Sequence, residues 1–339
     1  MLFVSDFFTR HKEAVSNQLE LLAEKQSGKI IAATRFMGQR ALHKDDTRDG
    51  IFVVPSFTYP IILAAMILSG RDAVHVFEEE SFWWKKALFN MSRRPLYVSL
   101  YRRPELEHID YLRSYKYLQK IFVELPVHKE MLIKHGFKSH QISIAPTPAK
   151  IGREKSTKEY NPKDVSIVFA SWNNSEPNAL YNRGLVYLLD LLVSNPECSL
   201  SIPLRDSKID EFLSLAKEKS VESRINLLEI KSIKELESLY DQADFVAFTA
   251  QDRVVKDVPN SLIDGLSYGK PSIITDVLDF WTVVDENKVG IVIKQGTSPE
   301  RLNITANQYK HMSKRAYDYS ANHTPDTYQR LGTDYRLES

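Results

Sequence analysis

The sequence lacks most of the features that mark specialised classes of protein. It has a single cysteine, Cys198, in 339 residues, which excludes an intramolecular disulfide and a cysteine-based zinc site. Its net charge of +1 carries no signature of a nucleic-acid-binding protein, so no nucleic-acid partner is expected. The longest apolar run, residues 61–68, is far shorter than the ~20 residues that a membrane span needs. We therefore expect an ordinary globular chain of about two domains.

Motifs of several common reactions are also missing. The sequence has no Gly-x-Gly-x-x-Gly dinucleotide fingerprint, no Walker lysine loop and no Gly-x-Ser-x-Gly elbow. It has no His-x-x-x-His pair and no Asp-x-Asp at a predicted strand end, so we expect no metal site and no cofactor. The start of the chain is apolar for only four residues and does not resemble a signal peptide, which favours a cytoplasmic location.

What the chain does contain is two blocks in which apolar, strand-like runs alternate with helix-like runs. A Pro-rich break at residues 145–148 and a polar stretch at 151–163 separate the two blocks. Continuous apolar strands that alternate with helices indicate parallel sheets covered on both faces. We predict an α/β fold of two Rossmann-like, doubly wound domains that face a central cleft. The predicted domains are residues 1–150 and 151–310, followed by a helical tail at 311–339.

The most informative stretch, residues 256–276, reads as loop, helix, tight turn and buried strand. Pro259 fixes the backbone just before a helix start, and Asn260 and Ser261 are both favourable N-cap types. Exposed amides and the positive end of the helix dipole bind anions at such a start. Asp264 lies one turn inside the helix, where it could hydrogen-bond a sugar hydroxyl beside a bound phosphate.

This stretch resembles the donor-binding loop and helix of retaining glycosyltransferases with the GT-B fold, in particular the glycosyltransferase 4 family. The family pattern is Glu, seven residues, Glu, then a small residue, Gly-Lys-Pro and a strand. Here Lys256 stands at the first acidic position, Asp264 at the second, and Gly-Lys-Pro at 269–271. A Tyr-x-x-Ala-Asp step at 240–244 and the pair Arg183-Gly184 also match, and the resemblance covers most of residues 110–300.

The resemblance implies a hexosyltransferase-like enzyme that moves a sugar from a nucleoside-diphosphate sugar to an acceptor hydroxyl, with retention and without a metal. Residues 1–150 would bind the acceptor, a glycan that is lipid-linked in many resembled enzymes, and residues 151–310 would bind the donor. The tail at 311–339 would pack back toward the N-terminal domain. Such an enzyme would serve polysaccharide biosynthesis in the cytoplasm or at the inner face of the membrane.

The resemblance also assigns site residues. Lys256 and Arg183 would neutralise the leaving diphosphate, and Arg102 would contact the acceptor. Glu78 follows a predicted strand and would orient or deprotonate the acceptor hydroxyl. Donor contacts would fall on Ser171, Asn173, Arg183, Asp257, Asn260, Ser261, Leu262 and Asp264.

The chain departs from the family pattern at two places in the donor site. The Gly-Arg that usually ends the first strand of the second domain is Ala170-Ser171 here. Asp252 or Asp257, rather than Lys256, are alternatives for the first acidic position. A binding or accessory protein that keeps the GT-B fold with reduced catalysis is therefore an alternative to an active enzyme.

A third hypothesis concerns residues 82–103, which are rich in aromatic and basic side chains. Trp84, Ala87, Leu88 and Met91 share one predicted helical face, which suits shallow binding to an anionic membrane surface. The alternative is a domain helix whose tryptophans lie in the core. A membrane-surface binding module is accordingly another possible function.

Overall fold

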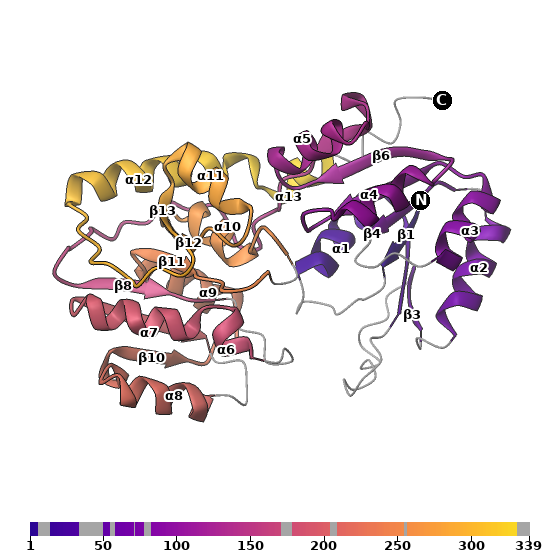
Figure 1. Cartoon of the computed structure of the whole chain (residues 1–339). Coiled ribbons are helices and arrows are strands. Elements are labelled where there is room, and N and C mark those ends of the chain that lie inside the picture. Colours follow the sequence, from indigo (N-terminus) through magenta and orange to yellow (C-terminus); the bar gives the residue numbers. More distant parts are fainter. Residues whose placement is uncertain are drawn as a thin grey trace. The chain divides into compact units, whose positions relative to one another are not determined.

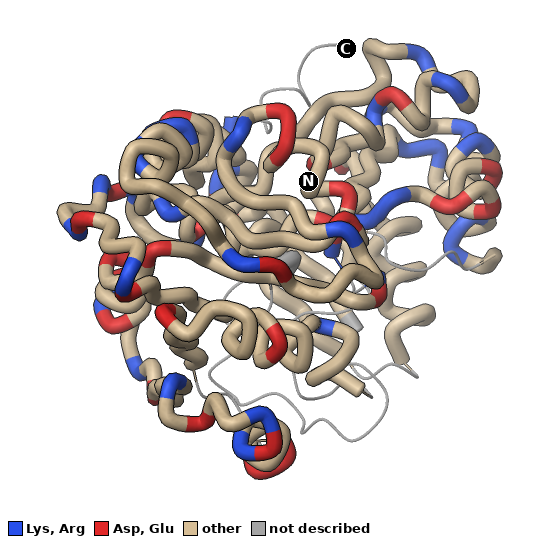
Figure 2. The backbone as a smooth tube through the Cα atoms, turned by 60° about the vertical axis from the view of Figure 1, so that its left-hand side comes forward, with Lys and Arg blue, Asp and Glu red and all other residues tan. Residues whose placement is uncertain are grey.

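A computed structural model describes residues 1–5, 14–33, 50–54, 58–70, 72–77, 83–170, 178–203, 209–253 and 256–330. The chain divides into two compact units. Unit 1 comprises Met1–Thr147 and the chain from Pro325 onward, and unit 2 comprises Pro148–Thr324. Each unit is built around one parallel sheet (Figure 1), which confirms the predicted α/β class. Lys and Arg are interspersed with Asp and Glu along the chain (Figure 2).

The sheet of unit 1 has seven strands in the order β3-β2-β1-β4-β5-β6-β7. The order reverses between β1 and β4, which makes their carboxyl ends the topological switch point of this sheet. The strands are β1 (Leu2–Ser5), β2 (Lys29–Ala33), β3 (Ile51–Val54), β4 (Val74–Phe77), β5 (Leu96–Leu100), β6 (Leu118–Val123) and β7 (Ile142–Ile144).

Helices cover both faces of this sheet. They are α1 (Ala14–Gln26), α2 (Tyr59–Ser69), α3 (Trp83–Ser92), α4 (Leu106–Arg113), α5 (Pro126–Lys134) and α13 (Pro325–Arg330). Leu2 and Val4 of β1 pack in one core with α2, α3, α4 and α5. Phe3, between them, points to the other face and packs with α1 and α13. The last described helix of the chain therefore belongs to the core of the first unit.

The sheet of unit 2 has six parallel strands in the order β10-β9-β8-β11-β12-β13. This order reverses between β8 and β11, as in a dinucleotide-binding Rossmann sheet. The strands are β8 (Val165–Val168), β9 (Cys198–Pro203), β10 (Ile225–Leu228), β11 (Phe245–Phe248), β12 (Ser272–Thr275) and β13 (Gly290–Ile293). The helices are α6 (Ala179–Asn182), α7 (Leu185–Ser194), α8 (Ile209–Glu218), α9 (Ile233–Gln242), α10 (Asn260–Ser267), α11 (Phe280–Asn287) and α12 (Ala306–Tyr319).

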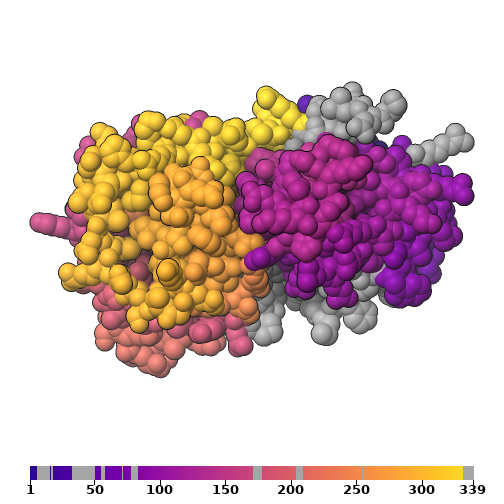
Figure 3. All heavy atoms as spheres, turned by 45° about the horizontal axis from the view of Figure 1, so that its top comes forward, coloured from indigo at the N-terminus to yellow at the C-terminus, as the bar shows by residue number. Residues whose placement is uncertain are grey.

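Helix α10 is buried from Ser261 to Ser267 and packs very closely on the sheet. A β-carbon at Gly265 would lie 2.4 Å from Cγ2 of Val246 in β11, so only glycine permits this approach. Helix α12 packs against α10 and runs over the surface of unit 2 (Figure 3). The predicted boundary between residues 310 and 311 falls inside α12, which as a whole belongs to unit 2.

None of the helices in the described ranges is long and apolar enough to cross a bilayer.

Candidate functional site

Two segments that are far apart in the sequence meet at the carboxyl end of β11. The amide of Gln251 donates a hydrogen bond to the carbonyl of Asn182 at 2.9 Å. The hydroxyl of Thr249 donates to the carbonyl of Gly184 at 2.8 Å. Since β8 and β11 are the strands at which the order reverses, this is the place where doubly wound sheets bind ligands. Arg183 lies in this turn, beside the loop that follows β11.

Gly184 allows the two segments to come together. Its φ is +81°, and a β-carbon there would lie 1.7 Å from the carbonyl oxygen of Thr249. Any other residue would push the loop after β11 away from the turn that carries Arg183. The pair Arg183-Gly184, which was assigned by resemblance alone, thus has a steric reason in this chain.

Helix α10 begins one residue earlier than its polar residues suggest. Pro259 occupies the N-cap position with φ −63° and ψ 126°, and its carbonyl accepts the amide of Leu262 at 3.1 Å. Asn260 and Ser261 are therefore the first helical residues and not the cap. Their amides lie at the positive end of the helix dipole, which is where helices bind anions.

Lys256 is held against this first turn. Its side chain is only 9% exposed, and its Nζ donates to Oδ1 of Asn260 at 2.9 Å. Two residues predicted to contact the donor are thus in direct contact with each other. A buried ammonium group at the positive end of a helix strengthens the attraction for an anion at that point.

Asp257 already has cationic and backbone partners. Nη1 of Arg253 lies 3.7 Å from its Oδ1, and the same oxygen accepts the amide of Asp279 at 3.4 Å. Nη2 of Arg253 also donates to Oδ1 of Asp279 at 3.1 Å. Sequence reasoning missed Arg253 and Asp279, although an aspartate at the N-cap of α11 is a helix-start signal that could have indicated the latter.

Asp264 faces the segment that opens unit 2. Its carboxylate is 4% exposed, and Oδ1 accepts the backbone amide of Lys150 at 2.7 Å. Burial raises the pKa of this carboxyl from 3.8 to about 6, while the amides of Lys150 and Ile151 and the charge of Lys256 act in the opposite direction. A contact between Asp264 and a ribose stays a prediction, and the hydrogen bond to Lys150 is a structural role beside it.

The remaining predicted residues are less informative. Leu262 is fully buried and Ser261 is nearly so, which leaves mainly backbone atoms for any ligand contact. Arg102 is exposed and follows β5 in unit 1, and Asp252 is also exposed. Three predicted residues lie outside the described ranges: Glu78, Ser171 and Asn173.

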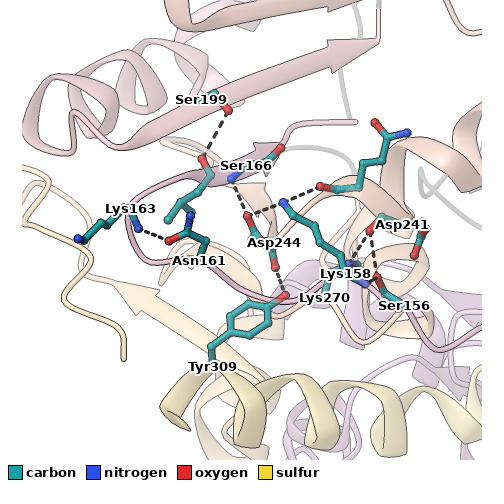
Figure 4. A network of polar contacts seen from close by, with 12 residues as sticks. Ser156, Lys158, Asn161, Lys163, Ser166, Ser199, Asp241, Asp244, Lys270 and Tyr309 are labelled. Atoms are coloured by element: carbon teal, nitrogen blue, oxygen red, sulfur yellow. Dashed lines mark hydrogen bonds and ion pairs between the residues drawn. The ribbon is translucent and has the colours of Figure 1, made fainter. Parts of the chain in front are cut away.

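A second polar network lies at the opposite, amino end of the unit 2 strands (Figure 4). Asp244, which directly precedes β11, is 1% exposed. Its carboxylate accepts the amide of Ser166 at 2.8 Å and Nζ of Lys158 at 2.7 Å. Its carbonyl accepts the hydroxyl of Tyr309 in α12 at 2.8 Å. This aspartate therefore ties together two strands, α12 and the segment that opens unit 2.

Lys270 of the Gly-Lys-Pro motif belongs to the same network. It is 1% exposed and donates to Oγ of Ser156 at 2.6 Å and to the carbonyl of Asp241 at 2.8 Å. Burial lowers the pKa of its ammonium group to about 8. Within unit 2, the lysine of this motif thus supports the fold at the amino ends of the strands.

The predicted membrane-facing side of α3 is wrong in part. Leu88 is only 8% exposed and lies in the core. Trp84 packs edge-on against Tyr59 of α2, with ring centroids 6.3 Å apart. The reason is that α3 packs on α2 and the sheet through Trp84 and Leu88. Ala87 and Met91 of the predicted side are exposed as expected, and Trp83 is exposed as well.

Comparison by sequence gives no relative, since no protein-family model and no curated protein matches the chain. Comparison by structure finds similar proteins. The chain is similar to HepE from Anabaena in complex with UDP-glucose, with a TM-score of 0.72 and 13% identity over 99% of each chain. It is also similar to a glycosyltransferase from Rickettsia africae, with a TM-score of 0.68 and 14% identity over 100% of this chain and 99% of that one.

WaaG, a glycosyltransferase involved in lipopolysaccharide biosynthesis, matches over 99% of this chain and 98% of its own, with a TM-score of 0.65 and 12% identity. At such identities the likeness establishes the fold. With its two parallel sheets in two compact units, the chain has the GT-B fold of these glycosyltransferases, which confirms the fold predicted from its sequence.

Proposed function

We propose that this chain is a glycosyltransferase that moves a sugar from a nucleoside-diphosphate sugar to an acceptor hydroxyl, with retention and without a metal. One observation carries the proposal. The turn with Arg183, the loop after β11 and the start of α10 with Lys256 all lie at the carboxyl side of the unit 2 sheet. The sharing of this fold with HepE, whose structure was solved with UDP-glucose, supports a nucleotide sugar as the donor.

The charges and amides around α10 suit the diphosphate of such a donor. In the proposed reaction the bond between the sugar and the diphosphate breaks, and negative charge grows on the leaving phosphate. The first amides of α10 and the ammonium group of Lys256 would stabilise that charge, as a metal does in other transferases. Arg183 would add a second cation, and Asp264 would accept a hydrogen bond from the ribose.

The acceptor side of the proposal rests on unit 1. Glu78 would orient or deprotonate the acceptor hydroxyl, and Arg102 would contact the acceptor. The acceptor would be a glycan, in its lipid-linked form if the enzyme works at the inner face of the membrane. In that case residues 82–103 would contact the anionic membrane surface.

The test of the proposal is release of nucleoside diphosphate from purified protein with a panel of sugar nucleotides and a glycan acceptor. The Lys256→Ala variant should lose about a hundredfold in turnover, because one preorganised charge at the leaving group contributes about that much. Lys219→Ala is the matched control, since Lys219 forms its ion pair with Asp190 between α7 and α8. Equal turnover in both variants would exclude the assigned role of Lys256.

A second candidate function is a binding protein that keeps the fold without turnover. Ala170-Ser171 in place of Gly-Arg and Lys256 in place of the first acid favour it. A nucleoside diphosphate that binds only the native state must raise its melting temperature. Stabilisation by a nucleotide without product release from any donor would therefore identify the binding protein.

A further inference from the structure

Helix α2 exposes an apolar stripe. Its sequence from Tyr59 to Ser69 contains no charged residue. Ile61 is 72% exposed and Leu68 is 56% exposed, and the exposed Ala65 lies between them. The spacing of four and three residues places these side chains on one side of the helix, opposite the buried Leu63 and Ile67.

Helix α3 exposes a second stripe of the same kind. Trp83 is 80% exposed, Met91 is 69% exposed, and Ala87 between them is exposed as well. Among the described residues, Trp83, Ile61 and Met91 are the three most exposed large hydrophobic side chains. All three lie on the neighbouring helices α2 and α3, whereas single exposed apolar residues are usually scattered over a protein surface.

The two stripes belong to one surface. Helices α2 and α3 pack side by side on the same face of the unit 1 sheet (Figure 1), and the edge contact between Tyr59 and Trp84 joins them. Their sides opposite the core therefore point the same way. We call the exposed side chains of Ile61, Ala65, Leu68, Trp83, Ala87 and Met91 the α2–α3 surface.

The charges at the edge of this surface indicate what covers it. Residues 83–94 hold four cations and no acid: Lys85, Lys86, Arg93 and Arg94. Lys85 and Arg94 are buried, so the cations at the edge of the surface are the exposed Arg93 and the half-buried Lys86. An apolar centre with a cationic edge is complementary to the interface of an anionic bilayer. A second copy of the chain, docked through the same surface about a two-fold axis, would bring like charges together.

We propose that the α2–α3 surface inserts into the interface of an anionic lipid bilayer. This deepens the membrane contact named under the proposed function, because it assigns the contact to α2 as well as α3 and to apolar insertion as well as charge. Membrane binding is measured by vesicle flotation, which does not depend on sugar transfer. Failure of this proposal is therefore distinguishable from failure of the proposed enzymatic function.

Flotation of the full-length chain with vesicles tests the proposal. The vesicles contain phosphatidylcholine alone or phosphatidylcholine and phosphatidylglycerol in equal amounts. The wild type should float with the anionic vesicles. The double variant Ile61→Ser, Leu68→Ser should lose about tenfold or more of the bound fraction, because burying each large aliphatic side chain contributes a factor of that order.

The matched control is the double variant Val193→Ser, Ile233→Ser, which removes two similarly exposed apolar side chains, 53% and 54%, from unit 2. It should float like the wild type. A third variant, Lys86→Gln with Arg93→Gln, should lose binding to anionic vesicles mainly at low salt, where charges are least screened. Flotation of the Ile61, Leu68 variant at the wild-type level, or a wild type that stays unbound, would overturn the proposal.

A label at one position locates the contact. Cys198 is buried and is the sole cysteine, so a Met91→Cys variant takes a thiol-reactive, environment-sensitive dye at position 91. Its emission should rise when anionic vesicles are added, and the same dye at Val193→Cys should not respond. Emission at position 91 that rises with protein concentration in the absence of lipid would show that a second copy covers the surface, and would also overturn the proposal.

Discussion

At the scale of single residues, Asp264 stands out because its position is unfavourable for a carboxylate. The side chain is buried, and burial raises its pKa from 3.8 to about 6. Between these two pH values the folded chain binds the proton more tightly than the unfolded chain does. The free energy of unfolding therefore falls as the pH rises through this window. A neutral side chain that still accepted a hydrogen bond from the Lys150 amide would avoid this loss of stability. We therefore expect the negative charge of Asp264 to contribute to ligand binding.

Replacing Asp264 with Asn tests this directly. The variant keeps an oxygen for the Lys150 amide but cannot ionise. Relative to the wild type it should be more stable by up to about 3 kcal/mol at about pH 8, and equally stable near pH 4, at about 1.4 kcal/mol per pH unit of the window. Thermal melting across this pH range is the measurement. An equal change at all pH values, or the same profile for the exposed control Asp210→Asn, would contradict it.

Lys256 and Lys270 differ in how far their surroundings could be predicted from the sequence. The segment from Lys256 to Asp264 could be predicted because helix-start chemistry is local, and the contact between Lys256 and Asn260 spans only one turn. The role of Lys270 could not, because its partners, Ser156 and Asp241, are brought to it only by the fold. A buried lysine also looks like a surface lysine in the sequence, and burial with two acceptors is a property of the tertiary structure.

At the scale of elements, the buried strands were the most predictable part of the chain. Continuous apolar runs predict the strands β1, β2, β4, β5 and β11, because both faces of these strands are buried. The elements that were not predicted are α4, α6, α11 and β13. Helix α4 buries only Ile109 and Leu112 of its eight residues, and β13 is half-exposed throughout, so neither carries a strong periodic signal.

The contact between the α6–α7 turn and the end of β11 is an element-scale feature with a matched control. Gly184 and Gly296 both have positive φ, +81° and +77°, but only Gly184 has a neighbour within 4 Å of an added β-carbon. Both alanine variants should lose about 1 kcal/mol through the backbone conformation. Gly184→Ala should in addition displace Thr249, lose further stability and weaken nucleoside diphosphate binding.

Melting temperature and nucleotide titration of the two variants provide the measurement. If Gly296→Ala weakened nucleoside diphosphate binding as much as Gly184→Ala does, the close approach of the α6–α7 turn to the loop after β11 would not contribute to binding.

At the scale of the whole molecule, the chain enters unit 1 twice. Unit 2 ends at Thr324, and α13 then packs on α1 within unit 1. Tyr328 of α13 is 1% exposed, and its hydroxyl lies 3.4 Å from that of Tyr101. The sequence showed a helical, Tyr-rich tail but not which helix belonged to which unit. That division depends on Tyr309 packing in unit 2 and Tyr328 packing in unit 1, and the two tyrosines look alike in the sequence.

This pair of tyrosines gives a prediction for the molecule as a whole. Tyr309 donates to the Asp244 carbonyl and stacks on Tyr160 at 4.2 Å, so Tyr309→Ala should weaken unit 2. Tyr328→Ala should weaken unit 1, and each change should cost about 3–5 kcal/mol as for other buried aromatic residues. Hydrogen exchange read by mass spectrometry separates the two effects. Tyr328→Ala should reduce protection in β5 and β6 and leave β11 and β12 unchanged, and Tyr309→Ala should do the reverse. The same peptides losing protection in both variants would show that the two units unfold as one, and the last helix would then stabilise the entire chain.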